Sequence, residues 1–169
     1  MIATLKQFKF KYFPIALIIA YVPFHLTEEA LLNFPLWMYE HYGLPKPLSY
    51  PHWLMNNSFF LITLLVGLTI FLRNTTNYLS IGIGILIWGF MNTMEHTVFS
   101  ILDLKFSPGF FTSIILFVPI AISGFINLCL NRQLNRMVFI KSIGIAFCYW
   151  IIPIIFIVSM GKVMIKVFP

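Results

Sequence analysis

The sequence predicts an all-α fold, a polytopic bundle of about five transmembrane helices, and three observations support this prediction. The chain of 169 residues is 60% hydrophobic and only 9% charged, whereas about a quarter of the residues in a soluble domain are charged. Its mean hydropathy is +0.91. Apolar runs of roughly 20 residues, enough to cross ~30 Å of hydrocarbon as a helix, recur along the whole length. Such runs are expected to be helical because a spanning segment must satisfy its own backbone hydrogen bonds.

Five apolar segments follow one another, and we expect them to form one integral membrane domain over residues 1–169. They cover residues 12–32, 53–72, 78–102, 110–130 and 140–160. Carboxylates lie in the last part of the first segment. The alternative that this segment is re-entrant therefore stays open, and the chain would then cross the membrane four times. Five crossings place seven Lys and Arg residues on the side of the N-terminus and four on the other side. This bias predicts a cytoplasmic N-terminus in a multi-pass protein of the cell membrane.

The longest link between the segments, residues 33–52, reads NFPLWMYEHYGLPKPLSYPH. Its four prolines and its glycine argue against a continuous helix, and its aromatic residues indicate a position at the outer membrane interface. The net charge of +6 is explained by Lys and Arg residues that mark cytoplasmic loops. The expected partner is therefore the lipid bilayer and not a nucleic acid, and assembly as a homo-oligomer stays open.

The first candidate motif lies at the end of the first apolar segment, in the stretch PFHLTEEALL. It contains His25, Glu28 and Glu29, and two of the five acidic residues of the chain are adjacent here. The spacing i, i+3, i+4 places all three side chains toward one face of an α-helix. An ionisable residue at the centre of a bilayer costs roughly 2.5–3.5 kcal/mol on insertion scales, so residues of this kind indicate function.

The second candidate motif has the same spacing and lies in the third segment, in the stretch GFMNTMEHTVF. It contains Asn92, Glu95 and His96. At about 1.5 Å per residue, both motifs lie ~20–27 Å along helices that run in the same direction, which places them in the same leaflet. Asn56 and Asn57, near the start of the second segment, enter from that side at a comparable height. We therefore expect the two motifs to converge on one polar layer.

The two motifs, followed by a Ser-Pro-Gly stretch at residues 107–109, resemble the HXXEE-motif family of small bacterial integral membrane proteins. The resemblance covers most of the chain. It implies that the residues of the motifs form the signature of the family, and a membrane metalloenzyme is the function usually suggested for it.

The function that uses every member of the predicted cluster is that of a membrane-embedded metalloenzyme acting on a lipid-like or apolar substrate. Histidine nitrogen and carboxylate oxygen atoms suit a divalent metal such as zinc, iron or manganese. The expected ligands are His25, Glu28, Glu95 and His96. The remaining carboxylate, Glu29, is the candidate catalytic base for a metal-bound water. The supporting polar residues are Asn92, Asn56 and Asn57.

Two other functions stay open at this point. A cluster of His and Glu side chains in a helical bundle also relays protons or binds cations, which suits a small proton- or cation-coupled transporter. Alternatively, the polar residues hydrogen-bond between helices and serve only to hold the bundle together. This structural interpretation explains each motif separately, but not why both have the same spacing and depth.

Overall fold

The computed structural model describes residue 5 and residues 7–42 and 49–167, and every regular element among them is a helix. The α-helices and the two π-helical turns, labelled η, are α2 (Tyr12–Ala20), η1 (Tyr21–His25), α3 (Leu26–Leu31), α4 (Phe34–Tyr42), α5 (Tyr50–Arg73), α6 (Leu79–Asp103), α7 (Phe110–Thr112), η2 (Ser113–Phe117), α8 (Val118–Leu130) and α9 (Arg136–Val167).

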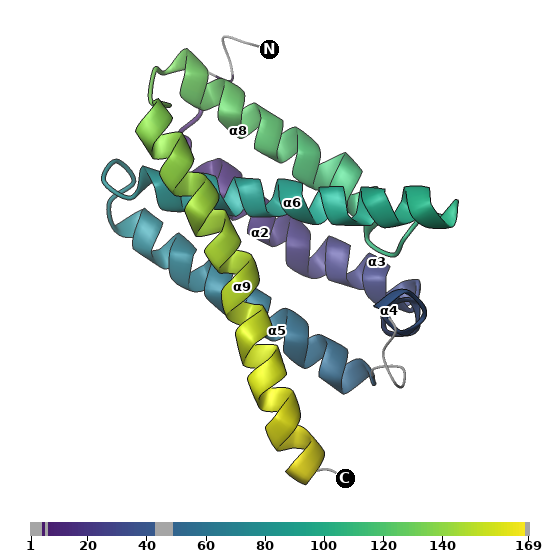
Figure 1. Ribbon diagram of the computed structural model, residues 1–169. Coiled ribbons are helices and arrows are strands. Elements are labelled where there is room, and N and C mark those ends of the chain that lie inside the picture. Colours follow the sequence, from purple (N-terminus) through teal and green to yellow (C-terminus); the bar gives the residue numbers. More distant parts are fainter. Residues whose placement is uncertain (1–4, 6, 43–48, 168–169) are drawn as a thin grey trace.

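Helix α6 is the centre of the bundle. It contacts α2, α5, α8 and α9, and α9 crosses in front of it in Figure 1. Ten of its residues are buried, including the polar residues Asn92, Thr93 and His96. The side chains of Ile83, Ile85 and Leu86 are completely buried. The third predicted segment is therefore the helix around which the others pack.

The distribution of residues is that of a helical membrane protein. Within the described part of the chain, four helices are long and apolar enough to cross a membrane: Tyr12–Leu31, Tyr50–Arg73, Phe110–Leu130 and Arg136–Ile157. Apolar side chains such as Ile62, Ile115 and Ile155 are more than half exposed on the outside, whereas histidine, glutamate and asparagine side chains are buried inside. Together with the central α6, these helices agree with the predicted bundle of about five spans.

When α6 is counted as the third of the five membrane helices, the first (Tyr12–Leu31) and the fourth (Phe110–Leu130) each contain one π-helical turn. η1 links α2 to α3 and contains Pro23, and η2 links α7 to α8 and is followed by Pro119. A proline has no N–H for the regular i to i−4 hydrogen bond, which favours such a local change of helix geometry. The turn η1 ends at His25, so the helix geometry changes directly at the first motif.

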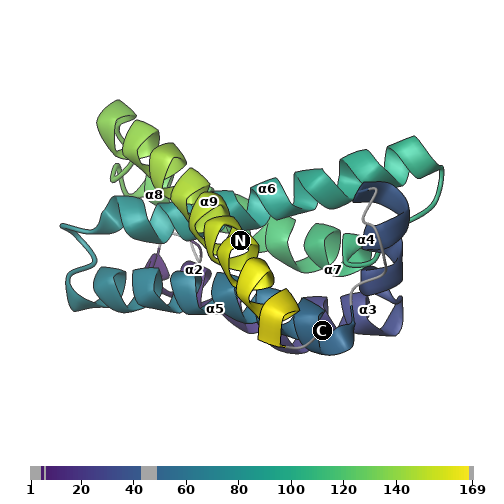
Figure 2. The ribbon, with the colours of Figure 1, turned by 60° about the horizontal axis from the view of Figure 1, so that its bottom comes forward.

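The link after the first membrane helix is helical over part of its length, whereas the sequence argued only against one continuous helix. Residues Phe34–Tyr42 form α4, and Pro35 is tolerated because the first helical turn has no intrahelical acceptors for its N–H groups. Figure 2 shows α4 standing across the end of the bundle, between α3 and the C-terminal end of α6. The predicted break over residues 43–47 lies outside the described residues.

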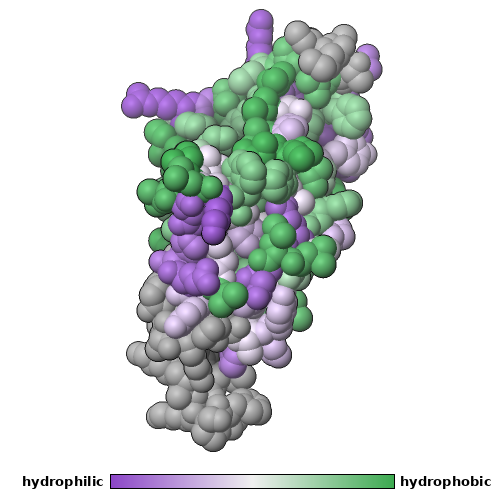
Figure 3. Space-filling model, turned by 90° about the vertical axis from the view of Figure 1, so that its right-hand side faces the viewer, coloured by the Kyte–Doolittle hydropathy of each residue, from purple (hydrophilic) through white to green (hydrophobic). Residues whose placement is uncertain are grey.

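Helix α4 is fixed to α6 by aromatic and polar contacts. The rings of Trp37 and Phe99 pack edge to face with centroids 5.1 Å apart, and His41 forms an ion pair with Asp103. Seen from this end, the surface carries hydrophilic patches between hydrophobic ones (Figure 3). Helix α4 therefore covers the end of the bundle at which the two motifs lie.

The close packing of α6 against α9 gives a first prediction. A Cβ atom on Gly84 would lie 2.8 Å from Cγ2 of Ile145 and 3.4 Å from the carbonyl oxygen of Ser142, whereas a Cβ on Gly144 would meet nothing within 4 Å. We expect Gly84→Leu to destabilise the protein by about 1–3 kcal/mol because it forces the two helices apart. Thermal unfolding in detergent measures the effect, with Gly144→Leu as the matched control. Equal melting temperatures for the two variants would contradict the described packing.

Candidate metal site

Three ionisable side chains from the two motifs meet inside the bundle. His25 and Glu29 come from the first membrane helix and His96 comes from α6, and all three are at least 97% buried. His25 and Glu29 are four residues apart on one face, and the Nε2 atom of His25 lies 3.4 Å from Oε1 of Glu29. The Nε2 atom of His96 lies 3.6 Å from the same oxygen. Each of the three residues therefore offers one ligand atom, and these three atoms all lie within 4.8 Å of one another.

The two imidazole rings are oriented by hydroxyl groups on their far sides. Nδ1 of His25 lies 2.9 Å from Oγ1 of Thr112, and that hydroxyl donates its proton to the carbonyl oxygen of Gly109. Nδ1 of His96 lies 3.2 Å from Oγ of Ser107, whose proton goes to the carbonyl oxygen of His96. Each hydroxyl oxygen is thus left to accept a hydrogen bond, so each neutral ring carries its proton on Nδ1.

The consequence is that both Nε2 atoms present lone pairs to the Glu29 carboxylate. The side-chain atoms Nε2 of His25 and Oε2 of Glu29 are buried and have no hydrogen-bond partner among the described residues. Three acceptor atoms that face one another without a donor between them are unfavourable in an apolar interior. A cation placed among them removes this conflict.

The geometry of the three acceptors fits a metal ion. Ligand bonds of about 2.0–2.1 Å around a tetrahedral zinc ion place two ligand atoms about 3.3–3.4 Å apart. The separations of 3.4 Å and 3.6 Å between Glu29 Oε1 and the two Nε2 atoms are close to this value. Hydrogen bonds from the outer ring nitrogen, such as those to Thr112 and Ser107, are the usual support of a metal-binding histidine. The cluster of His25, Glu29 and His96 can therefore hold a divalent metal.

Gly109 closes the site from the side of the α6–α7 loop. Its φ of +89° is a left-handed conformation, which favours glycine. A Cβ atom here would lie 2.6 Å from Cε1 of His25 and 2.8 Å from Cε1 of His96. The Ser-Pro-Gly stretch therefore packs directly onto both rings, and Ser107 and Gly109 each contact the cluster.

Glu28 faces away from the cluster and binds the start of the fourth membrane helix. Its two carboxylate oxygens accept hydrogen bonds from the backbone N–H groups of Phe111 (3.0 Å) and Thr112 (2.7 Å). A carboxylate of the chain itself thus binds the free N–H groups at this helix N-terminus. Because Thr112 also holds the ring of His25, Glu28 positions a member of the cluster.

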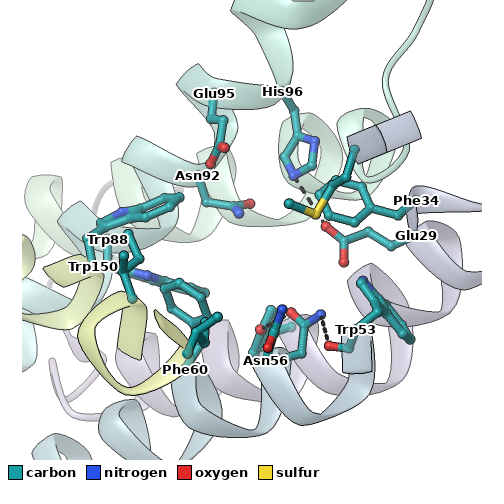
Figure 4. Close-up of a pocket in the computed structure, with 15 residues that line it drawn as sticks. Glu29, Phe34, Trp53, Asn56, Phe60, Trp88, Asn92, Glu95, His96 and Trp150 are labelled. Atoms are coloured by element: carbon teal, nitrogen blue, oxygen red, sulfur yellow. Dashed lines mark hydrogen bonds and ion pairs between the residues drawn. The ribbon is translucent and has the colours of Figure 1, made fainter. Parts of the chain in front are cut away.

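The remaining residues of the prediction lie around a cavity of about 260 Å³ next to the cluster. Its walls include Glu29, Asn92, Glu95, His96, Asn56 and Asn57. Figure 4 shows the side chains of Glu29 and Asn92 directed into the same space as that of Glu95. Asn57 accepts a hydrogen bond of 2.7 Å from the hydroxyl of Tyr21. The structure thus brings Glu29 between the histidines, and it places Glu95 in the adjoining cavity.

Several residues of the site were not among those predicted from sequence. They are the residues that orient the rings, Ser107 and Thr112, and three tryptophans of the cavity wall, Trp53, Trp88 and Trp150. A signal for the first two was present, since the Ser-Pro-Gly stretch starts a segment at the same membrane face as both motifs. The tryptophans come from α5, α6 and α9, and no sequence spacing links them.

Comparison with known proteins assigns the chain to a family. The family model described as "Protein of unknown function with HXXEE motif" matches residues 16–123, which is more than half of the chain. The chain therefore belongs to the HXXEE family. No curated protein and no solved structure matches it.

The double hydrogen bond of Glu28 leads to a second prediction. Replacement of Glu28 by Gln removes the charge and one of the two acceptor atoms, and a hydrogen bond to a charged group is worth about 1.5–3 kcal/mol. We expect Glu28→Gln to lower the melting temperature in detergent, whereas Glu40→Gln, which removes the same charge from an exposed position, is expected to leave it unchanged. Identical unfolding curves for the two variants would show that this contact contributes nothing.

Gly109 leads to a third prediction. Gly109→Ala combines a left-handed backbone with a steric conflict with both imidazole rings, and such strain costs of order 1–3 kcal/mol. We expect a clear loss of thermal stability relative to Gly144→Ala, which has open space around its new methyl group. Differential scanning fluorimetry in detergent makes the comparison. A Gly109→Ala protein as stable as the control would contradict the described loop.

Proposed function

We propose that the protein is a membrane-embedded metalloenzyme in which His25, Glu29 and His96 hold a divalent metal. The observation that carries the proposal is the convergence of three buried side chains, His25, Glu29 and His96, whose ligand atoms all lie within 4.8 Å of one another. A role limited to helix packing is less well supported, because polar residues that join helices pair with each other. Here one carboxylate oxygen of Glu29 faces Nε2 of both histidines, and Nε2 of His25 has no hydrogen-bond partner among the described residues.

Two histidines and one carboxylate are a common catalytic ligand set. With zinc, such sites keep a position open for water or substrate, and with iron they occur in oxygenases. A metal bound here supplies a Lewis acid and an activated water. Hydrolysis is the reaction class that this set suits best when a cavity adjoins it. In this proposal Glu29 is a ligand and not the base expected from sequence, and Glu28 is a positioning residue.

The chain itself contributes orientation and exclusion of water. The side chains of Phe117 and Tyr21 pack beside the ring of His25, at centroid distances of 4.9 Å and 5.9 Å, and Phe34 lies beside His96 at 6.1 Å. This apolar surrounding strengthens electrostatic interactions within the site. The cavity reaches the cluster, because Glu29 and His96 are both part of its wall. Its position inside a bundle with apolar outer faces favours a lipid-like substrate whose polar part enters the cavity.

Metal content tests the proposal directly and is the fourth prediction. Protein purified in detergent is expected to contain close to one zinc, iron or manganese ion per chain by mass spectrometry. The variants His25→Ala, His96→Ala and Glu29→Gln are expected to lose it because each removes one ligand. His52→Ala, which changes a histidine bonded to Ser49 and outside the cluster, is the matched control and should retain the metal.

The same proteins provide the contradicting outcome. A parent protein that elutes as a single folded species, yet stays empty after reconstitution with each of the three metals, would exclude the metal site. For the reaction, micelles of ester and phosphoester lipids are the substrates, and product release by the parent but not by Glu29→Gln is expected. Equal release by both proteins would exclude metal-dependent hydrolysis at this cluster.

A further inference from the structure

A second cavity lies at the other end of the bundle, away from the metal site. It has a volume of about 550 Å³, and its walls come from the segment before α2, from the end of α5 with the loop that follows, and from Gln133 between α8 and α9. In Figure 1 these loops lie at the left and upper left, whereas α3 and α4 lie at the right. Three of the lining residues, Lys9, Lys11 and Arg73, are basic. We call this space the basic cavity.

The positive charges of the basic cavity have no carboxylate to balance them. All five acidic residues of the chain lie in α3, in α4 or in the C-terminal half of α6. Every ion pair in the described part of the chain involves a histidine, and none involves a lysine or an arginine. The ammonium group of Lys11 lies 5.5 Å from the ring centroid of Tyr12, a contact that leaves its charge in place. Cations that share one cavity repel one another, and an anion bound between them removes the repulsion.

The segment before α2 is held in place, so its lysines are not on a free arm. The buried side-chain amide of Asn127 in α8 donates hydrogen bonds to the carbonyl oxygens of Leu5 (2.6 Å) and Phe8 (2.9 Å). The ring of Phe10, which lines the cavity, packs edge to face on that of Phe71 near the end of α5, with centroids 5.9 Å apart. These contacts join the walls of the basic cavity to one another, so the site is formed before any ligand binds.

The loop after α5 adds neutral hydrogen-bond donors to the cations. Asn74, Thr75 and Gln133 all line the cavity. The side-chain oxygen of Asn74 accepts a hydrogen bond of 3.0 Å from the backbone N–H of Asn77, which fixes the loop and leaves the amide NH₂ group as a donor. A guanidinium group such as that of Arg73 can present two parallel N–H groups to a phosphate. Cations together with neutral donors are therefore suited to a phosphate group.

The basic cavity lies at the level where lipid headgroups are expected. Lys11 directly precedes the first membrane helix, Tyr12–Leu31, and Arg73 is the last residue of the second, Tyr50–Arg73. The charge bias predicts that this side is cytoplasmic, and the cytoplasmic leaflet carries anionic lipids. Leu72 also lines the cavity and is 41% exposed. An apolar surface thus adjoins the cations, and a lipid covers such a surface whereas a free anion does not.

We propose that the basic cavity binds the phosphate group of an anionic lipid headgroup, such as that of phosphatidylglycerol. Arg73 binds two of the phosphate oxygens, and Lys9 and Lys11 supply further positive charge. The lipid's glycerol and acyl parts lie against Leu72. The inference does not depend on the proposed metalloenzyme function, because the basic cavity and the metal cluster share no residue.

The alternative explanation is a general attraction of loop lysines and arginines to an anionic membrane surface. That attraction depends on the number of charges near the surface and not on their arrangement around a cavity. Arg136 separates the two explanations. It is exposed at the start of α9, close to the loop that contributes Gln133, but it does not line the basic cavity.

Native mass spectrometry of the whole chain in detergent tests the inference. The probe is phosphatidylglycerol, and phosphatidylcholine with the same acyl chains is the control lipid, because it carries the phosphate without a net charge. We expect the first phosphatidylglycerol molecule to bind at concentrations about tenfold lower than phosphatidylcholine. Inorganic phosphate in large molar excess is expected not to displace the bound lipid, because it cannot cover the apolar part of the wall.

Variants locate the binding. Arg73→Gln is expected to reduce the preference for phosphatidylglycerol by about tenfold, and Lys9→Gln combined with Lys11→Gln is expected to do the same. Arg73→Lys is expected to retain only part of the preference, since it keeps the charge but loses the paired N–H groups. Arg136→Gln removes an equal charge at the same end of the bundle and is expected to retain the full preference. Melting temperatures in detergent check that all variants are folded.

Three outcomes would overturn the inference. Equal binding of the two lipids by the parent protein excludes a site for an anionic headgroup. Equal losses of preference in Arg73→Gln and Arg136→Gln show a general attraction to the membrane surface instead of binding in the basic cavity. Displacement of the lipid by inorganic phosphate shows that the ligand is a free anion and not a lipid. Metal content has no bearing on any of these results, so the inference and the proposed function fail independently.

Discussion

The arrangement of the bundle depends on one physical constraint, the burial of ionisable groups among apolar helices. A single charged residue at the centre of a bilayer costs roughly 2.5–3.5 kcal/mol, and this chain buries His25, Glu29 and His96 together. The hydroxyls of Thr112 and Ser107 occupy the outer ring nitrogens. In the proposed function, a metal ion bound between these three side chains offsets the cost of burying them together.

The surrounding elements are arranged so that this point is enclosed. α6 takes the central position and carries polar residues on its buried side. The turn η1 brings His25 onto the same face as Glu29, and Glu28 fastens the start of the fourth membrane helix against the first. Helix α4 covers the end of the bundle. The contacts of Glu28 with Thr112 and of Trp37 in α4 with Phe99 join segments far apart in sequence, so the site and the fold stabilise one another.

The sequence predicted the bundle and the meeting of its two motifs, because hydropathy and the rise per residue depend only on local composition and length. It could not assign the adjacent residues Glu28 and Glu29, which point about 100° apart on a helix. One meets backbone N–H groups of α7 and the other meets two imidazoles. Which neighbour each carboxylate meets depends on helix packing, and the same is true of Ser107, Thr112 and the three tryptophans.

The most direct test of the account is X-ray absorption spectroscopy at the edge of the metal bound by the purified protein. The account predicts a coordination sphere with two imidazole nitrogens and at least one oxygen at about 2.0–2.2 Å. The spectrum of the parent protein is expected to show multiple scattering from two imidazole rings. If the His96→Ala variant retains metal, its spectrum is expected to show multiple scattering from one ring only. A sphere of oxygen atoms alone, or one with thiolate sulfur from Cys129 or Cys148, would contradict the proposed site.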